Sequence, residues 1–141
     1  MNTKYFSKFA ILLLFFQPVA WAEKPLAPES LPGITRVDAE MAAELIVGTA
    51  NLIVIDSRKD IEYSKGHIQG SVSLLDTDMT FKSLAEHVPD KTIPVLFYCN
   101  GKRCLRSSRA AIKALDWGYK EVYWFRGGWN EWVDKGMPIS R

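Results

Sequence analysis

The chain has 141 residues, with 18 basic and 16 acidic side chains and a formal net charge of +2 at pH 7. This length favours a single domain, and 48% hydrophobic with 24% charged residues is typical of a globular protein. A charge so close to balance argues against a general nucleic-acid-binding or anionic-membrane-binding surface, so neither partner is expected.

Residues 1–22 have the features of a secretory signal peptide. Two lysines precede an apolar run at residues 9–16, and Ala20-Trp21-Ala22 fits a small-x-small cleavage site. The apolar run is short for a membrane-spanning helix, which favours a cleaved leader over an uncleaved anchor. We therefore expect cleavage after Ala22, a periplasmic or secreted protein, and no membrane association after cleavage. The mature chain would keep 16 basic and 16 acidic side chains.

The rest of the chain divides into a linker and one domain. Residues 23–33 hold three prolines and few large apolar side chains, which predicts an extended linker. In residues 34–141, short apolar segments alternate with segments of helical periodicity, and the connections are short. This alternation predicts an α/β domain with a central parallel sheet of about five strands and helices on both faces. The strands are expected at 34–37, 52–55, 72–75, 94–98 and 121–125, and the helices at 39–47, 59–64, 81–88, 109–115 and 129–133.

Both cysteines of the chain lie between one expected strand and the helix that follows it. Cys99 and Cys104 are five positions apart, with Lys102, Arg103 and Arg106 nearby and no acid among them. A thiol in such a loop faces backbone N–H groups without intrahelical partners, and the helix dipole and the cations favour its thiolate. The segment therefore indicates an activated sulfur nucleophile or an anion pocket. A disulfide here would close a very small ring and stabilise the fold little, which favours a redox or sulfur-handling role.

The expected sheet also suggests which side chains support this loop. Ligands of parallel α/β sheets bind outside the carboxyl ends of the strands, and Asp56 and Cys99 each follow such an end. We expect Asp56 and Arg58 to brace the site by a salt bridge. His67 lies beside a glycine turn and is interpreted as a structural, hydrogen-bonding side chain, with a general acid or base as the alternative. The histidines and cysteines show no metal-ligand spacing, so no metal is expected.

Five segments, in order along the chain, carry a resemblance to a known family. They comprise a strand ending in Asp-x-Arg, a Gly-His-Ile-x-Gly segment, a cysteine after a buried strand, the start of the next helix, and a C-terminal region containing Gly-Gly-Trp. These segments lie at residues 52–58, 62–71, 98–99, 106–111 and 118–132. Together they resemble the single-domain rhodaneses, members of the sulfurtransferase superfamily, over about residues 34–139.

The resemblance implies a persulfide mechanism. Cys99 would attack the outer sulfur of a small anionic donor such as thiosulfate, hold that sulfur as a persulfide, and pass it to a thiol, cyanide or a protein acceptor. No metal or organic cofactor is implied. The backbone N–H groups of the loop would cradle the charged sulfur, which gives a substrate-binding role to Asn100, Gly101, Lys102, Arg103, Cys104, Leu105 and Arg106.

The loop departs from the family pattern in length and in its second cysteine. The family places an arginine five positions after the cysteine, whereas Arg106 stands seven positions after Cys99. Family members with enlarged loops include phosphatases and arsenate reductases. Two alternatives therefore stay open: a thiol–disulfide or oxyanion-reducing enzyme that uses Cys99 and Cys104 as a pair, and a non-catalytic sulfur carrier or binding module. In either case a monomer or weak dimer is expected.

Overall fold

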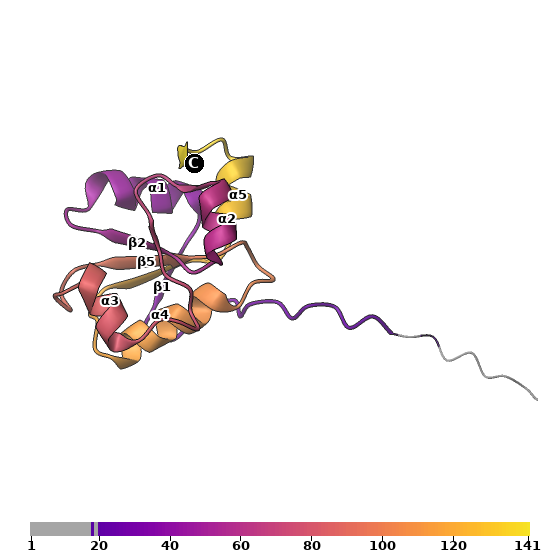
Figure 1. The fold of residues 1–141 in the computed structure, drawn as a ribbon, viewed down its shortest axis with the longest axis horizontal. Coiled ribbons are helices and arrows are strands. Elements are labelled where there is room, and N and C mark those ends of the chain that lie inside the picture. The colour runs from indigo at the N-terminus through magenta and orange to yellow at the C-terminus, as the bar shows by residue number, and fades with distance from the viewer. Residues whose placement is uncertain (1–17, 19) are drawn as a thin grey trace, which may run out of the picture.

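A computed structural model describes residue 18 and residues 20–141 of the chain (Figure 1). Residues 1–17 and 19, on which most of the signal-peptide prediction rests, lie outside the described residues. The described part contains no helix with the length and apolar character needed to span a bilayer.

The centre of the fold is a five-stranded sheet in which every pair of neighbouring strands is parallel. The strand order is β1-β6-β5-β2-β4. β5 lies in the middle and all of its residues are buried, as its continuous apolar sequence predicts. The predicted fold class is therefore confirmed. The strands are β1 Thr35–Val37, β2 Ile53–Asp56, β4 Val72–Ser73, β5 Val95–Tyr98 and β6 Val122–Phe125.

Helices cover both faces of the sheet. α3 and α4 pack on one face, and α1 and α5 pack on the other (Figure 1). On the α4 side, small residues such as Ala110 and Ala114 allow the helix to approach the buried Trp124 closely. On the opposite side, Trp132 of α5 packs edge-on against Phe125 of β6. The helices are α1 Ala39–Gly48, α2 Asp60–Lys65, α3 Phe81–His87, α4 Arg106–Asp116 and α5 Gly128–Asp134.

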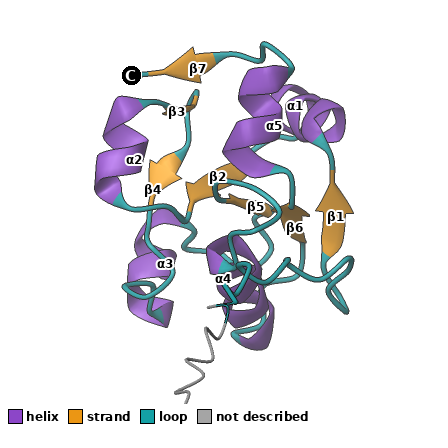
Figure 2. Cartoon of the chain, turned by 90° about the vertical axis from the view of Figure 1, so that its right-hand side faces the viewer, coloured by secondary structure: helices purple, strands orange, loops and turns teal. Residues whose placement is uncertain are grey.

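A second, two-stranded sheet was not predicted from the sequence. β3 (His67–Ile68) pairs antiparallel with β7 (Ile139–Ser140) and joins the C-terminal end to the side of the domain where α2 lies (Figure 2). Strands of two residues are too short to show alternation in the sequence, so only the three-dimensional pairing reveals them.

The segment at residues 23–33, expected to be a linker, is mostly exposed but is anchored to the domain at two positions. Ala27 is 3% exposed and Leu31 is 6% exposed, and both belong to the hydrophobic core. The buried guanidinium of Arg126 donates to the carbonyl oxygens of Ala27, at 2.8 Å, and Pro28, at 2.9 Å. The packed domain thus includes residues before 34, because two apolar side chains of this segment join the core and Arg126 binds its backbone.

Candidate active site

The cysteine loop leaves the end of β5 and leads into α4, and the start of α5 fixes its first two residues. The backbone N–H groups of Trp129 and Asn130 donate to the carbonyl oxygens of Cys99, at 2.8 Å, and Asn100, at 2.9 Å. This approach requires glycine at position 128, where φ is +56° and a Cβ would collide with the Cys99 carbonyl oxygen. The Gly-Gly-Trp segment of the sequence therefore serves to hold the cysteine loop.

Glu62 of α2 joins the two ends of the loop. Its Oε1 accepts a hydrogen bond of 2.6 Å from the Asn100 side chain, and its Oε2 lies 3.6 Å from Arg106 Nη1. Partial burial opposes ionisation of this carboxyl and is the largest single influence on it. The hydrogen bonds from Asn100 and the Lys59 N–H, together with the charges of Arg106 and Arg58, outweigh burial and lower the pKa of Glu62. The Glu62 carboxylate thus links Asn100, which follows Cys99, to Arg106, which begins α4.

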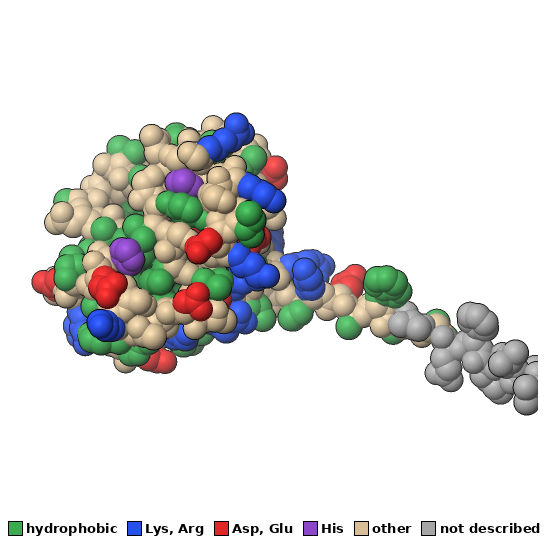
Figure 3. All heavy atoms as spheres, in the orientation of Figure 1, with side chains coloured by type: hydrophobic (Ala, Val, Ile, Leu, Met, Phe, Trp, Pro, Cys, Tyr) green, Lys and Arg blue, Asp and Glu red, His purple; other side chains and the backbone are tan. Residues whose placement is uncertain are grey.

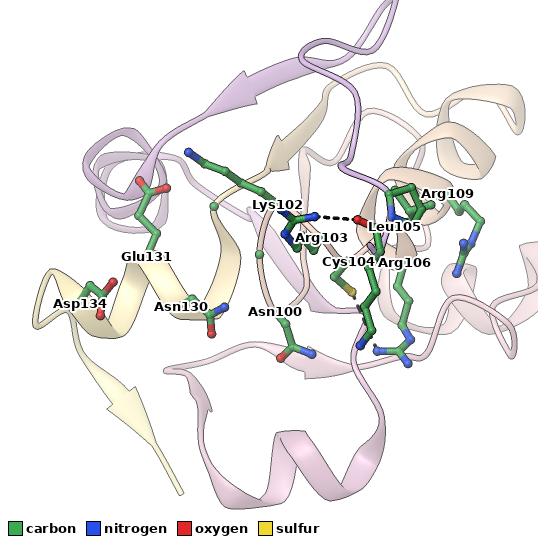
Figure 4. Close-up of a pocket in the computed structure, with 14 residues that line it drawn as sticks. Asn100, Lys102, Arg103, Cys104, Leu105, Arg106, Arg109, Asn130, Glu131 and Asp134 are labelled. Carbon is green, nitrogen blue, oxygen red and sulfur yellow. Dashed lines mark hydrogen bonds between the residues drawn. The ribbon is translucent and has the colours of Figure 1, made fainter. Parts of the chain in front are cut away.

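Cys104 is the cysteine that faces the solvent-accessible pocket. Its side chain is half-buried and lines the pocket, and Arg106 Nη1 lies 3.9 Å from its sulfur (Figure 4). The Cys99 thiol is the main cause that lowers the pKa of Cys104, to about 6, and the backbone N–H groups of Arg106 and Asn100 add to this effect. The environment of Cys104 therefore favours its thiolate form.

Cys99 has the opposite environment. It is 1% exposed, it does not line the pocket, and its S–H faces both the sulfur and the carbonyl oxygen of Cys104, the latter at 3.2 Å. Burial raises the pKa of Cys99, and the hydrogen bond to Cys104 raises it further. The structure thus favours the thiolate at Cys104, whereas the sequence-based expectation placed it at Cys99. The reason is the difference in burial, since Cys99 directly continues a fully buried strand, whereas Cys104 lies half-buried in the loop beside the pocket.

The pocket beside Cys104 has a volume of about 850 Å³ and walls of opposite charge. Lys and Arg side chains gather where the N-terminal segment meets the body of the domain (Figure 3). Figure 4 shows Arg106 and Arg109 on one side and Glu131 and Asp134 of α5 on the other, with the Lys102 side chain extending toward the α5 side. The walls include Lys102, Arg106 and Arg109 from the loop and α4, Lys24 and Pro25 from the N-terminal segment, and Asn130, Glu131 and Asp134 from α5.

The other residues predicted to bind substrate divide into two groups. Gly101 and Leu105 shape the loop: the Gly101 carbonyl accepts the Cys104 N–H at 2.9 Å, and Leu105 is the residue before α4. Arg103 points away from the sulfur, since its Nη1 donates to the Lys24 carbonyl at 2.8 Å. Arg103 therefore ties the loop to the N-terminal segment, and Arg106 is the arginine beside the thiolate.

Comparison with known proteins identifies the family of the chain. Residues 38–135 match the family model described as "Rhodanese-like domain". The chain belongs to the rhodanese-like domain family. Among its relatives, uncharacterized protein YibN of Escherichia coli K12 is 26% identical over 114 residues, covering 80% of this chain and 78% of YibN. Thiosulfate:glutathione sulfurtransferase of Saccharomyces cerevisiae is 30% identical over 97 residues, covering 61% and 68% of the two chains. The BH2092 protein of Bacillus halodurans shares the fold, with a TM-score of 0.65, 20% identity, and coverage of 75% and 76%.

The rhodanese-like domain has the predicted salt bridge beneath its loop. Arg58 Nη2 lies 2.7 Å from Asp56 Oδ2, and both side chains are buried. Arg58 also donates to the Gly66 carbonyl and stacks over Trp129, its Cζ 4.7 Å from the ring centroid. The Tyr98 hydroxyl donates to Asp56 at 2.5 Å, which links this pair to the residue before Cys99. The ion pair thus supports the strand end from which the loop departs.

His67 lies outside the pocket lining of the rhodanese-like domain. Its Nδ1 is 3.0 Å from the Tyr63 carbonyl oxygen, and its ring stacks on the Tyr63 ring at 3.7 Å. These contacts agree with the structural role expected for it. Among the residues that the structure describes, His, Cys, Asp and Glu form no group of three that could hold a metal ion.

Several contributors to the site were not predicted from the sequence, namely Glu62, Lys24 and the α5 residues Asn130, Glu131 and Asp134. Glu62 lies inside a segment that resembles the family, but its spacing gives no sign of its contacts. The bond between Asn100 and Glu62 spans 38 positions, and that between Arg103 and Lys24 spans 79. Lys24 lies in the segment expected to be a linker, so the wall that it forms could be found only from the fold.

Proposed function

We propose that this rhodanese-like domain is a sulfurtransferase that takes up sulfane sulfur on Cys104. The observation that supports this assignment is a half-buried thiol with a lowered pKa, open to a pocket and next to the guanidinium of Arg106. The sequence-based hypothesis placed the same chemistry on Cys99. Because the Cys99 sulfur is buried and its pKa is raised by that burial, Cys104 is the better nucleophile.

The reaction begins with attack of the Cys104 thiolate on the outer sulfur of an anionic donor such as thiosulfate. The S–S bond of the donor breaks, sulfite leaves with the electron pair, and Cys104 becomes a persulfide. The N–H groups of Asn100 and Arg106 then stabilise the negative charge. An acceptor thiolate or cyanide attacks the terminal sulfur, and Cys104 leaves as a thiolate that begins the next cycle.

The pocket and one relative support this reaction class. A volume of about 850 Å³ exceeds the needs of a small inorganic anion and leaves room for an organic thiol acceptor. The yeast relative is named as a transferase between thiosulfate and glutathione, a thiol of this kind. With the leader predicted at residues 1–22, this chemistry would operate in the periplasm or outside the cell.

Mass spectrometry of single-cysteine variants tests the proposal. After incubation with thiosulfate, Cys99→Ser is expected to gain one sulfur atom on Cys104 and to release one equivalent of sulfite. Cys104→Ser is expected to gain none. An adduct on Cys99 in the Cys104→Ser variant would show that Cys99, and not Cys104, accepts the sulfur. The absence of both adduct and sulfite with thiosulfate and with an organic persulfide donor would contradict sulfur transfer altogether.

A further inference from the structure

The proposed sulfur transfer gives no role to the thiol of Cys99, although this thiol lies directly against the nucleophile. The Cys104 N–H donates to the Gly101 carbonyl at 2.9 Å, and this turn folds the loop back over Cys99. The S–H of Cys99 then faces the Cys104 sulfur. The structure therefore holds two free thiols as a pair, one of them accessible and the other enclosed.

Polar groups surround the Cys99 sulfur in a way that a purely structural cysteine does not require. Ser107 is buried at the start of α4, and its Oγ lies 3.4 Å from the Cys99 sulfur. Trp124 Nε1 donates to the same Oγ at 3.0 Å, so the hydroxyl proton of Ser107 is free to point at Cys99. The backbone N–H of Ser107 also faces this sulfur.

These donors favour the anion of Cys99 over its thiol. A thiol gains little from two further N–H and O–H donors, whereas a thiolate gains strongly from both. The negative charge on Cys104 now opposes ionisation of Cys99, and it is one of the causes that raise the pKa of Cys99. When Cys104 carries a persulfide, the negative charge lies on the terminal sulfur, farther from Cys99. The charge then opposes ionisation of Cys99 less strongly.

We propose that Cys99 is a resolving thiol that attacks the sulfur of Cys104 in the persulfide and expels the bound sulfur as sulfide. This inference rests on the proposed function and adds a second, reductive outcome to it. The Cys99–Cys104 disulfide forms as the S–S bond of the persulfide breaks. The proton of Cys99 leaves on the expelled sulfur as HS⁻. Both cysteine sulfurs are oxidised to the disulfide, and the terminal sulfur is reduced by two electrons to sulfide.

The cycle closes when an external dithiol reduces the Cys99–Cys104 disulfide by exchange and becomes a disulfide itself. The side of the disulfide that an incoming thiolate reaches first is Cys104, because only this cysteine lines the pocket. The domain would thereby convert sulfane sulfur into sulfide, using a dithiol reductant, and transfer to an external acceptor would compete with this internal step.

A single-turnover experiment without any reductant tests the inference. Full-length protein is reduced, freed of reductant, mixed with thiosulfate, and followed by intact mass, sulfite release and sulfide release. The wild-type protein is expected to release one equivalent each of sulfite and sulfide and to end as the disulfide, lighter by two hydrogens. Cys99→Ser is expected to release the same sulfite, no sulfide, and to keep the added sulfur on Cys104.

The outcomes separate this inference from the proposed function. A wild-type protein that releases sulfite but holds a stable persulfide would overturn the resolving role and leave the transferase intact. Release of sulfide by Cys99→Ser at the wild-type rate would overturn it as well. If no form of the protein releases sulfite or changes in mass, the proposed transferase activity itself is contradicted. The wild-type result decides the matter even where the buried substitution impairs folding.

Ser107→Ala tests the positioning role of the hydroxyl, and Ser108→Ala is the matched control. Ser108 is the next residue of α4, and its Oγ donates to the Leu105 carbonyl at 2.9 Å instead of facing Cys99. Ser107→Ala is expected to slow sulfide release by about tenfold with the sulfite burst unchanged, and to move the pH dependence of sulfide release to higher pH. Equal pH profiles of sulfide release for the two variants would show that Ser107 does not assist Cys99.

Discussion

Replacing Cys104 by serine is expected to lower sulfur transfer from thiosulfate to cyanide by at least about a thousandfold. The hydroxyl of serine is a far weaker nucleophile than a thiolate, and the chain offers no other accessible thiol among its two cysteines. Initial rates of thiocyanate formation measure the effect. The hydrogen-bond donors around the site remain in place in this variant, so the loss of transfer rate would be due to removal of the Cys104 sulfur.

Cys99→Ser is the matched control for this result. Serine can still donate a hydrogen bond toward Cys104, so transfer to cyanide is expected to stay within about tenfold of the wild-type rate. A loss in Cys99→Ser as large as that in Cys104→Ser, in a variant with an unchanged free energy of unfolding, would contradict the assignment of the nucleophile to Cys104.

Replacing Asp56 by asparagine is expected to lower the free energy of unfolding by about 3–5 kcal/mol. The substitution keeps the size of the side chain but removes the charge that compensates Arg58, whose guanidinium is buried. An unpaired buried cation is costly because the protein interior solvates it poorly. Urea unfolding monitored by tryptophan fluorescence measures the change, and five tryptophans supply the signal.

The exposed ion pair between Lys135 and Glu40 supplies the comparison for Asp56. Glu40→Gln removes one carboxylate in the same way but at the surface, where solvent screens the lost attraction. It is expected to leave the unfolding midpoint nearly unchanged. Similar midpoints for Glu40→Gln and Asp56→Asn would show that the buried pair does not support the strand end beneath the loop.

The sheet and its helices could be predicted because each depends on local patterns. The continuous apolar run of β5 predicts a strand buried on both faces, and the side chain of Asp38 caps α1 by accepting the Met41 N–H at 2.9 Å. The pairing of β3 with β7 could not be predicted, since it joins residues 67–68 to 139–140 through two short bridges. The burial of Ala27 likewise depends on Arg126, 99 positions away.

The loop lies between a strand and a helix, as predicted, but the roles of its two cysteines depend on how deeply each sulfur is buried. The sequence shows that both thiols lie near three cations, and it does not show which sulfur is buried and which lines the pocket. Cys99 inherits the burial of the strand that it continues, whereas the turn at Gly101 carries Cys104 to the pocket. Arg103 and Arg106 look equivalent in the sequence, yet one binds the N-terminal segment and the other faces the thiolate.

The pH dependence of thiol alkylation tests the central assignment most directly. The fully reduced protein is treated briefly with iodoacetamide between pH 4 and pH 10, and peptide mass spectrometry locates the label. The pKa of Cys104, lowered to about 6, predicts that its labelling rate rises as the pH passes 6 and is level above pH 8, while Cys99 stays unlabelled. Labelling of Cys99 ahead of Cys104, or a labelling midpoint near pH 9 for Cys104, would contradict the account.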